Sequence, residues 1–264
     1  VKKAAARANA RVGVLNQELA DAIIEAADEV EQGKLMDQFV VDAIQGGAGT
    51  SINMNANEVI ANRAIEILGG KKGDYTKLSP NTHVNMAQST NDALPTAVHI
   101  AVLRLADGLC NALRTLHETL LEKAREMDDV IKMGRTHLQD AIPIRLGQEF
   151  GAYARVIGRD LDRVRESVNH MYEINMGATA VGTGLNALPE YTEYVTQYLA
   201  EETGFPLKQA EDFVDATQNT DRYTEVSASL KILAINLSKM ANDLRLLSSG
   251  PLTGLNEINL PARQ

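Results

Sequence analysis

Apolar residues recur every three to four positions over long stretches of this chain, as they do along one face of an α-helix. The longest stretches run from about residue 92 to 127, from 146 to 172 and from 221 to 249. Helices of this length need neighbours along most of their surface, because an isolated helix is only marginally stable in water. The pattern therefore predicts a mainly all-α protein built as an elongated bundle of long helices.

Shorter helical patterns lie between and before these stretches. Such helices are expected at residues 2–32, from a cap at Thr50 or Ser51 to about residue 68, and at residues 189–203. Gly33 and the Gly69-Gly70 pair would end the first two, because glycine readily adopts the left-handed conformation that closes a helix. Residues 39–44 could be extended, and residues 130–145 interrupt the helical pattern.

The two kinds of pattern divide the chain. We expect a partial N-terminal helical domain at residues 1–90. A central long-helix bundle domain, truncated at its C-terminal end, is expected at residues 91–264.

Half of the residues from position 83 to position 96 carry small or medium polar side chains. This stretch ends where the first long helix begins. Asn91 or Asp92 is therefore expected to cap that helix, and Pro95 fits its first turn.

Free backbone N–H groups at the start of a helix, together with the hydroxyls of Ser89 and Thr90, would attract an anion. A capped helix that binds no ligand accounts for the same residues. From this stretch alone, both interpretations stay open.

Net charge, cysteine content and the lengths of apolar runs exclude several classes of protein. The net charge is −9, with 26 basic and 35 acidic residues, which argues against a nucleic-acid-binding surface. One cysteine, Cys110, excludes an intrachain disulfide framework. No run approaches 18 consecutive apolar residues, and the chain does not open on an apolar signal region. We expect a soluble cytoplasmic protein that does not enter a membrane.

Common cofactor motifs are missing from the sequence. The five histidines are scattered and form no zinc-binding pair, so no metal site is predicted. The glycine-rich turn at residues 46–49 is not followed by the Lys and Ser or Thr of a phosphate-binding loop.

Three segments, in this order, resemble motifs of the fumarase/aspartase superfamily. They are residues 47–58, the run Gln88-Ser89-Thr90-Asn91-Asp92, and residues 132–143, and the resemblance extends over essentially the whole chain. Residues 215–221 are similar to the aspartate ammonia-lyases of that superfamily, whereas its fumarases carry a histidine in this stretch. The pairs Ser89-Thr90 and Thr50-Ser51 point the same way.

The resemblance implies a fold, an assembly and an activity. It implies the superfamily's helical bundle, assembled as a homotetramer in which each pocket takes loops from three subunits. The implied activity is a cofactor-independent, reversible deamination of L-aspartate to fumarate and ammonia through an aci-carboxylate intermediate. The alternatives are fumarate hydration and a non-catalytic helical scaffold of the same fold.

The resemblance also implies roles for particular residues. Thr50 contacts the substrate, Ser89 and Thr90 lie near the activated carboxylate, and Asn91 lies near the leaving group. Catalytic and substrate-contacting roles follow for the pair of the third motif, Thr136 and His137.

Other roles implied by the resemblance concern support and the base. Arg135 and Gln139 are expected to hold the loop of the third motif. In the superfamily, the serine that acts as the catalytic base lies in a Gly-Ser-Ser loop, and we expect that loop beyond Gln264. The chain is therefore expected to be an inactive piece of a longer protein.

Overall fold

The computed structural model describes residues 1–45 and 47–262, which form two compact units. The first unit contains residues 1–103 and 171–220, and the second contains residues 104–170 together with the described residues from 221 onward. Packing thus divides the chain inside its longest helix, between Leu103 and Arg104. A domain boundary near residue 90 stays a prediction.

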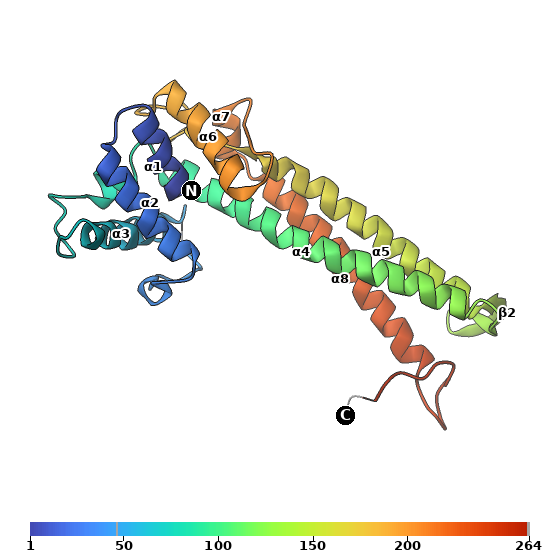
Figure 1. The fold of residues 1–264 in the computed structure, drawn as a ribbon. Coiled ribbons are helices and arrows are strands. Elements are labelled where there is room, and N and C mark those ends of the chain that lie inside the picture. Colours follow the sequence, from blue (N-terminus) through green and yellow to red (C-terminus); the bar gives the residue numbers. More distant parts are fainter. Residues whose placement is uncertain (46, 263–264) are drawn as a thin grey trace. The chain divides into compact units, whose positions relative to one another are not determined.

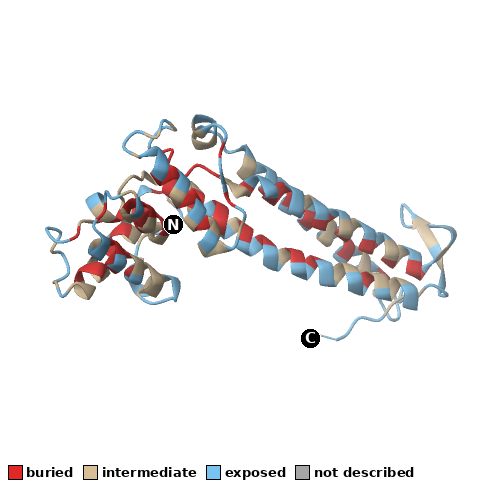
Figure 2. Cartoon of the chain, turned by 45° about the horizontal axis from the view of Figure 1, so that its top comes forward, coloured by how far each residue is buried: buried red, intermediate tan, exposed pale blue. Residues whose placement is uncertain are grey.

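The second unit is built on the three long helices that the sequence predicts. These are α4 (Thr90–Glu126), which begins in the first unit, α5 (Leu146–Asn169) and α8 (Asp221–Leu247). Side chains such as Leu113, Ile157 and Leu233 bring the three helices into one apolar core. Figure 1 shows the helices running beside one another, and Figure 2 shows buried residues recurring along them.

The first unit packs shorter helices around small residues. Its helices are α1 (Lys2–Arg11), α2 (Gln17–Glu31), α3 (Thr50–Ile67), α6 (Pro189–Thr203) and α7 (Phe213–Gln218). Alanines and isoleucines of α2 and α3, among them Ile23 and Ile65, form its core. Because alanine side chains are short, they let helix backbones approach closely.

Short elements complete the chain. They are the 3₁₀ helices η1 (Met36–Gln38) and η3 (His170–Tyr172), the π-helix η2 (Pro80–Val84), the parallel strands β3 (Glu173–Ile174) and β4 (Lys208–Gln209), and the antiparallel strands β1 (Ile131–Thr136) and β2 (Gln139–Arg145). The hairpin of β1 and β2 occupies the segment for which the sequence indicated only an interruption.

The expectation of one helix over residues 2–32 is wrong. The chain turns between α1 and α2, where Gly13 has a φ of +79° and Asn16 caps α2 by accepting a hydrogen bond from the Glu18 N–H. Val12 and Leu15 kept the apolar spacing across this turn. That spacing indicates which side chains face the core. It does not reveal a short break between two helices that pack on the same core.

The ends of α3 correct one expectation and confirm another. Gly49, with a φ of +77°, precedes the helix, and neither Thr50 nor Ser51 acts as its cap. Gly69, with a φ of +72°, follows the helix as predicted. Residues 39–44 form no strand, and position 46 of the expected glycine-rich turn lies outside the described residues.

One helix of the described chain, α4, is long and apolar enough to cross a membrane by length and composition alone. Its most apolar window has a mean hydropathy of 1.3, and 33% of that window is buried within this chain. Core helices of soluble proteins pass the same test, so the finding by itself does not indicate a membrane span.

Candidate functional site

The polar stretch before α4 forms a reciprocal cap. Ser89 lies just before the helix, and its hydroxyl oxygen accepts a hydrogen bond from the Asn91 N–H at 3.2 Å. In return, the Asp92 carboxylate accepts one from the Ser89 N–H at 2.9 Å. Ser89 therefore has the capping role that was expected of Asn91 or Asp92, and two of the helix's free donors are satisfied.

Asp92 also holds a distant glycine-rich loop. Its side chain is fully buried, and its second oxygen accepts hydrogen bonds from Gly177 N at 3.2 Å and Thr179 N at 2.9 Å. Burial raises the pKa of Asp92 to about 6, against the opposing effect of these backbone donors. With both oxygens engaged, Asp92 ties the loop to the helix and is poorly placed to act as a base.

Pro95 lies in the second turn of α4, one turn later than expected. It has no N–H, so the Asn91 carbonyl lacks its usual helical partner. The amide of Asn175 takes that place at 3.0 Å and also donates to the Thr217 hydroxyl at 3.1 Å. A buried side chain thus connects the helix start to the stretch at residues 215–221.

The side chain of Asn91 is anchored at one end only. Its amide nitrogen donates to the Ala180 carbonyl at 2.7 Å. Within the described chain, its oxygen has no hydrogen-bond partner, and the residue is half-buried. Asn91 therefore presents an acceptor beside the Ser89 and Thr90 hydroxyls.

The start of α3 reaches the same place. A Cβ on Gly49 would lie 2.1 Å from Leu94 Cδ2 of α4, and the φ of +77° at this position also favours glycine. Thr50 follows at the exposed first position of α3. One turn later, the amide of Asn53 donates to the Thr90 hydroxyl oxygen at 3.2 Å.

Thr136 and His137 lie at the tip of the β1–β2 hairpin in the second unit. Thr136 pairs with Gln139, which leaves His137 and Leu138 as a two-residue loop with φ values of +51° and +61°. This turn geometry favours glycine and asparagine, so the loop is strained. Thr136 and His137 are both exposed.

Ion pairs fix strand β1 of the hairpin. Arg135 forms a double hydrogen bond with Glu257, and Lys132 pairs with Glu257 and Glu149, each at 2.8 Å. A Cβ on Gly134 would lie 2.8 Å from the Ile142 carbonyl oxygen, beside the bulge in β1. The holding role predicted for Arg135 agrees with these contacts.

The predicted site residues thus form two groups. Thr50, Ser89, Thr90 and Asn91 belong to the first unit, where contacts of α3 and α4 bring them together. Thr136 and His137 belong to the second unit.

Sequence reasoning missed several supporting residues. Lys2 and Asn175 lie outside the quoted motifs and gave no signal, although both contact this region. Asn53 lies inside the first motif, so its position was available from the sequence.

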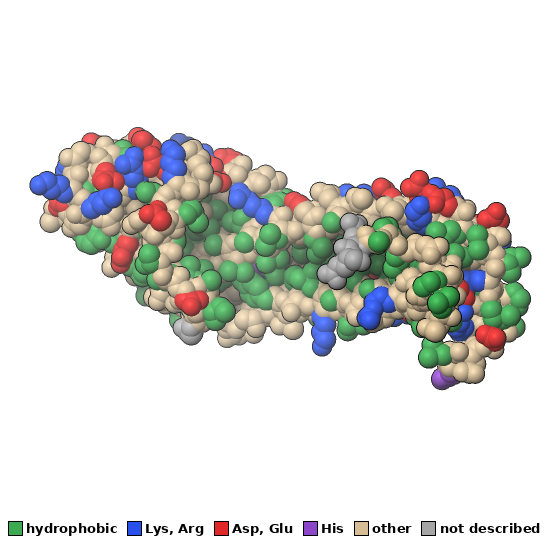
Figure 3. Space-filling model, turned by 90° about the horizontal axis from the view of Figure 1, so that it is seen from below, with side chains coloured by type: hydrophobic (Ala, Val, Ile, Leu, Met, Phe, Trp, Pro, Cys, Tyr) green, Lys and Arg blue, Asp and Glu red, His purple; other side chains and the backbone are tan. Residues whose placement is uncertain are grey.

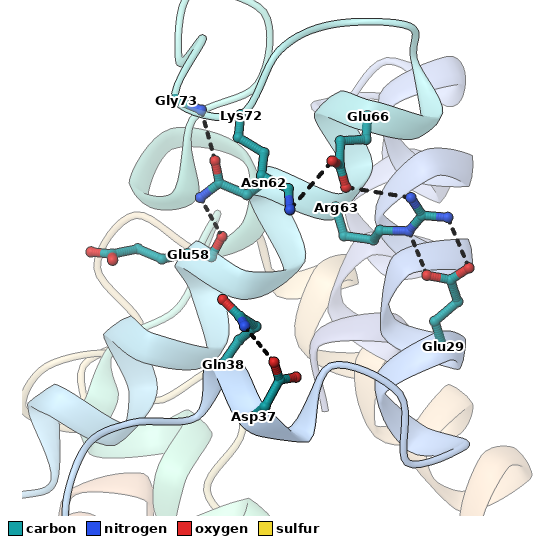
Figure 4. A network of polar contacts seen from close by, with 9 residues as sticks. All are labelled: Glu29, Asp37, Gln38, Glu58, Asn62, Arg63, Glu66, Lys72 and Gly73. Carbon is teal, nitrogen blue, oxygen red and sulfur yellow. Dashed lines mark hydrogen bonds and ion pairs between the residues drawn. The ribbon is translucent and has the colours of Figure 1, made fainter.

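A groove of about 360 Å³ lies beside α3, and three of its four charged residues form ion pairs, whereas the fourth, Glu58, is exposed. Arg63 donates two hydrogen bonds to Glu29, at 2.5 and 3.0 Å, and pairs with Glu66 at 3.4 Å, as Figure 4 shows. Lys72 pairs with Glu66 from the opposite side. This network stabilises the fold around α3, and it pairs both basic residues of the groove with carboxylates.

No group of three or more His, Cys, Asp or Glu side chains that could hold a metal ion occurs in the described part of the chain. The chemistry that the first group can supply is hydrogen bonding to an anion. Its donors are two hydroxyls at a helix start, where the helix dipole also favours negative charge.

Comparison with known proteins gives this geometry a context. All of residues 1–264 match the protein family described as Lyase. The chain belongs to this lyase family. An aspartate ammonia-lyase of Bacillus subtilis is 64% identical over the whole chain, which covers 56% of that protein. The family member therefore spans about half the length of the curated relatives it matches.

Solved structures of similar proteins share the fold. A protein titled fumarate lyase:delta crystallin from Brucella melitensis, bound to cobalt, matches with a TM-score of 0.97 and 50% identity. A class II fumarase from Schistosoma mansoni matches with a TM-score of 0.93 and 34% identity. The chain is fully covered in both, and it covers 57% and 58% of the two structures. The predicted helical fold of the fumarase/aspartase type is therefore confirmed for this lyase family member.

Proposed function

We propose that the whole protein is an aspartate ammonia-lyase, which deaminates L-aspartate reversibly to fumarate and ammonia. The observation that supports this most directly is the pair of adjacent hydroxyls at the start of α4. The oxygen of Ser89 accepts from Asn91 N, and that of Thr90 accepts from the Asn53 amide. Because each oxygen already accepts a hydrogen bond, each hydroxyl proton can be donated to a ligand.

Such donors suit an elimination that passes through an aci-carboxylate. When a base removes the proton next to a carboxylate, that carboxylate gains a second negative charge. Hydroxyls and a helix start that are already in place stabilise this charge more than they stabilise the ground state. We assign this role to Ser89 and Thr90, and contact with the other end of the substrate to Thr50.

Asn91 suits the departing amine. Its amide nitrogen is held by the Ala180 carbonyl, so its oxygen is left to accept an N–H of the ammonium group.

Hydration of fumarate is the second candidate, and the similarity to the Schistosoma mansoni fumarase favours it. The higher identity to an aspartate ammonia-lyase, 64% against 34%, supports deamination.

Thr136 and His137 are proposed to contact the substrate and take part in catalysis from the hairpin tip. An exposed tip of this kind can reach a pocket on another copy of the chain. We therefore propose a homotetramer in which separate copies supply the two groups of site residues.

Uncovered apolar surface on the second unit supports assembly. Leu105 and Ile235 are 75% and 57% exposed on α4 and α8, and Figure 3 shows hydrophobic side chains gathered over the long helices. Contiguous apolar surface of this kind usually marks an interface. We place the assembled protein in the cytoplasm and expect no nucleic-acid partner.

The test compares two substitutions at Thr90 in the whole protein. Fumarate formation from L-aspartate is followed by absorbance without added metal ions. Thr90→Val removes the hydroxyl and should lower kcat by about 10²- to 10³-fold, whereas Thr90→Ser keeps it and should retain most activity. Faster hydration of fumarate than deamination of aspartate would make the protein a fumarase. Failure to bind succinate or turn over either substrate would favour a scaffold.

A further inference from the structure

The first residue of α1, Lys2, sends its ammonium group into the region behind Thr90. Its nitrogen donates to Asn53 Oδ1 at 2.7 Å, Gln88 Oε1 at 2.8 Å and Asn85 Oδ1 at 3.0 Å. An ammonium group has three N–H donors, and this arrangement uses all of them. The three acceptors are neutral amides from two separate segments, α3 and the loop between η2 and α4, so Lys2 lies at the centre of a polar cluster.

The ammonium group sets the orientation of these amides. An amide whose oxygen faces Lys2 must turn its nitrogen the other way. The nitrogen of Asn53 accordingly donates to Thr90 Oγ1 and to Asn85 Oδ1, both at 3.2 Å. A short chain of hydrogen bonds therefore runs from Lys2 through Asn53 to the Thr90 hydroxyl.

We propose that Lys2 is a positioning residue for the anion site at the start of α4, acting through Asn53 to aim the Thr90 hydroxyl proton at a bound carboxylate. The proposal deepens the proposed function, since it concerns the same site. Without Lys2, the Asn53 amide can rotate and present its oxygen to Thr90. The Thr90 hydroxyl would then donate to Asn53 and be lost to the ligand.

The charge of Lys2 adds a second effect. None of its three hydrogen-bond partners is a carboxylate, and both oxygens of nearby Asp92 are engaged by backbone N–H groups. Burial lowers the pKa of Lys2 to about 7, and the attraction of Asp92 opposes this. An anion bound beside Thr90 would stabilise the ammonium form, so its binding should draw a proton onto Lys2.

Other titratable groups around α1 are engaged elsewhere. Lys3 pairs with Asp28 of α2 and Glu202 of α6, at 2.8 and 2.7 Å. On η2, His83 accepts a hydrogen bond from the Ser79 N–H through Nδ1, and burial lowers its pKa. Asp92 is thus the charged group that acts on Lys2 before a ligand binds.

The experiment compares Lys2→Met with Lys3→Met in the whole protein. Lys3 is the matched control, because it is the next residue on the same helix and its ion pairs lie outside the amide cluster. Succinate, a dicarboxylate that cannot be deaminated, is titrated calorimetrically at pH 7 in buffers of different ionisation enthalpy. A lysine with a pKa of about 7 is half-protonated there, so full protonation on binding takes up about half a proton per site.

We expect that uptake in the wild type and Lys3→Met, and none in Lys2→Met. Lys2→Met should also bind succinate about tenfold more weakly, the loss of roughly one charge-assisted hydrogen bond. Its kcat on aspartate should fall while Lys3→Met stays near wild type. Asn53→Ala should lower kcat and keep the proton uptake, since Lys2 remains.

Two results overturn the proposal. One is a wild type that binds succinate without proton uptake, or does not bind it, which needs no variant to fold. The other is a folded Lys2→Met that matches Lys3→Met in affinity, uptake and kcat. A wild type that shows Lys2-dependent uptake but releases no fumarate from aspartate supports the proposal while refuting the proposed function.

Discussion

Replacing Asn175 tests how the start of α4 compensates for Pro95. Asn175 is 3% exposed and donates to the Asn91 carbonyl and to the Thr217 hydroxyl. Asn175→Ala removes both bonds and leaves a carbonyl without a donor. At about 1 kcal/mol for each bond, with a further penalty for the orphaned carbonyl and the small cavity, the free energy of unfolding should fall by about 2–4 kcal/mol.

A second substitution should return part of that loss. Pro95→Ala restores an N–H one turn after Asn91, where it can donate to the Asn91 carbonyl that has lost its hydrogen bond from Asn175. In the Asn175→Ala background it should recover about 1 kcal/mol more than it contributes in the wild type. This coupling arises only if both residues serve the same carbonyl.

Urea unfolding of the whole protein and the three variants, at one fixed protein concentration, measures the coupling. The concentration is held constant because assembly contributes to apparent stability. Strictly additive effects of Asn175→Ala and Pro95→Ala would refute the compensation. A loss below about 0.5 kcal/mol for Asn175→Ala would show that water replaces its amide at no cost.

Two further predictions concern the loop and the hairpin. Gly182 has a φ of +90°, and a Cβ there would lie 2.5 Å from Val214 Cα, so Gly182→Ala should lower the melting temperature markedly. Gly151→Ala in α5 is the control. A Cβ on Gly151 has its nearest contact at 3.9 Å, so this substitution should not lower the melting temperature. Equal melting temperatures would contradict this. Hydrogen bonding to Arg135 lowers the pKa of Glu257 from 4.5, so its stabilising effect is present above pH 4.5 and disappears as pH falls through the lowered value. Glu257→Gln should therefore be less stable than wild type at pH 7, and the difference should shrink in acid; a difference that is constant with pH would count against the pairing.

Local patterns predicted the helices well. The expected helix at residues 189–203 matches α6, and the expected starts at residues 146 and 221 match α5 and α8. An apolar spacing of three to four residues is a property of a short segment, and so are glycine stops such as Gly69. These features need no knowledge of what lies elsewhere in the chain.

Local patterns failed where the same signal fits two structures. Apolar spacing ran through the turn at residues 12–16, and the short apolar segment at 39–44 forms no strand. The hairpin at 131–145 was missed because its loop, His137-Leu138, has none of the residues that usually mark such a turn. A strained loop is stable only when its surroundings hold it, and here Arg135 and Lys132 do so through Glu257.

Motif order in the amino-acid sequence was sufficient to indicate the fold and to single out six candidate site residues, Thr50, Ser89, Thr90, Asn91, Thr136 and His137. It could not show what supports them. The Gly177 and Thr179 N–H groups that hold Asp92 lie 85 and 87 positions along the chain, and Lys2 lies 51 positions from Asn53. Hydrogen bonds act over about 3 Å in space whatever the separation along the chain. Which amide faces which lysine was therefore decided only when the helices packed.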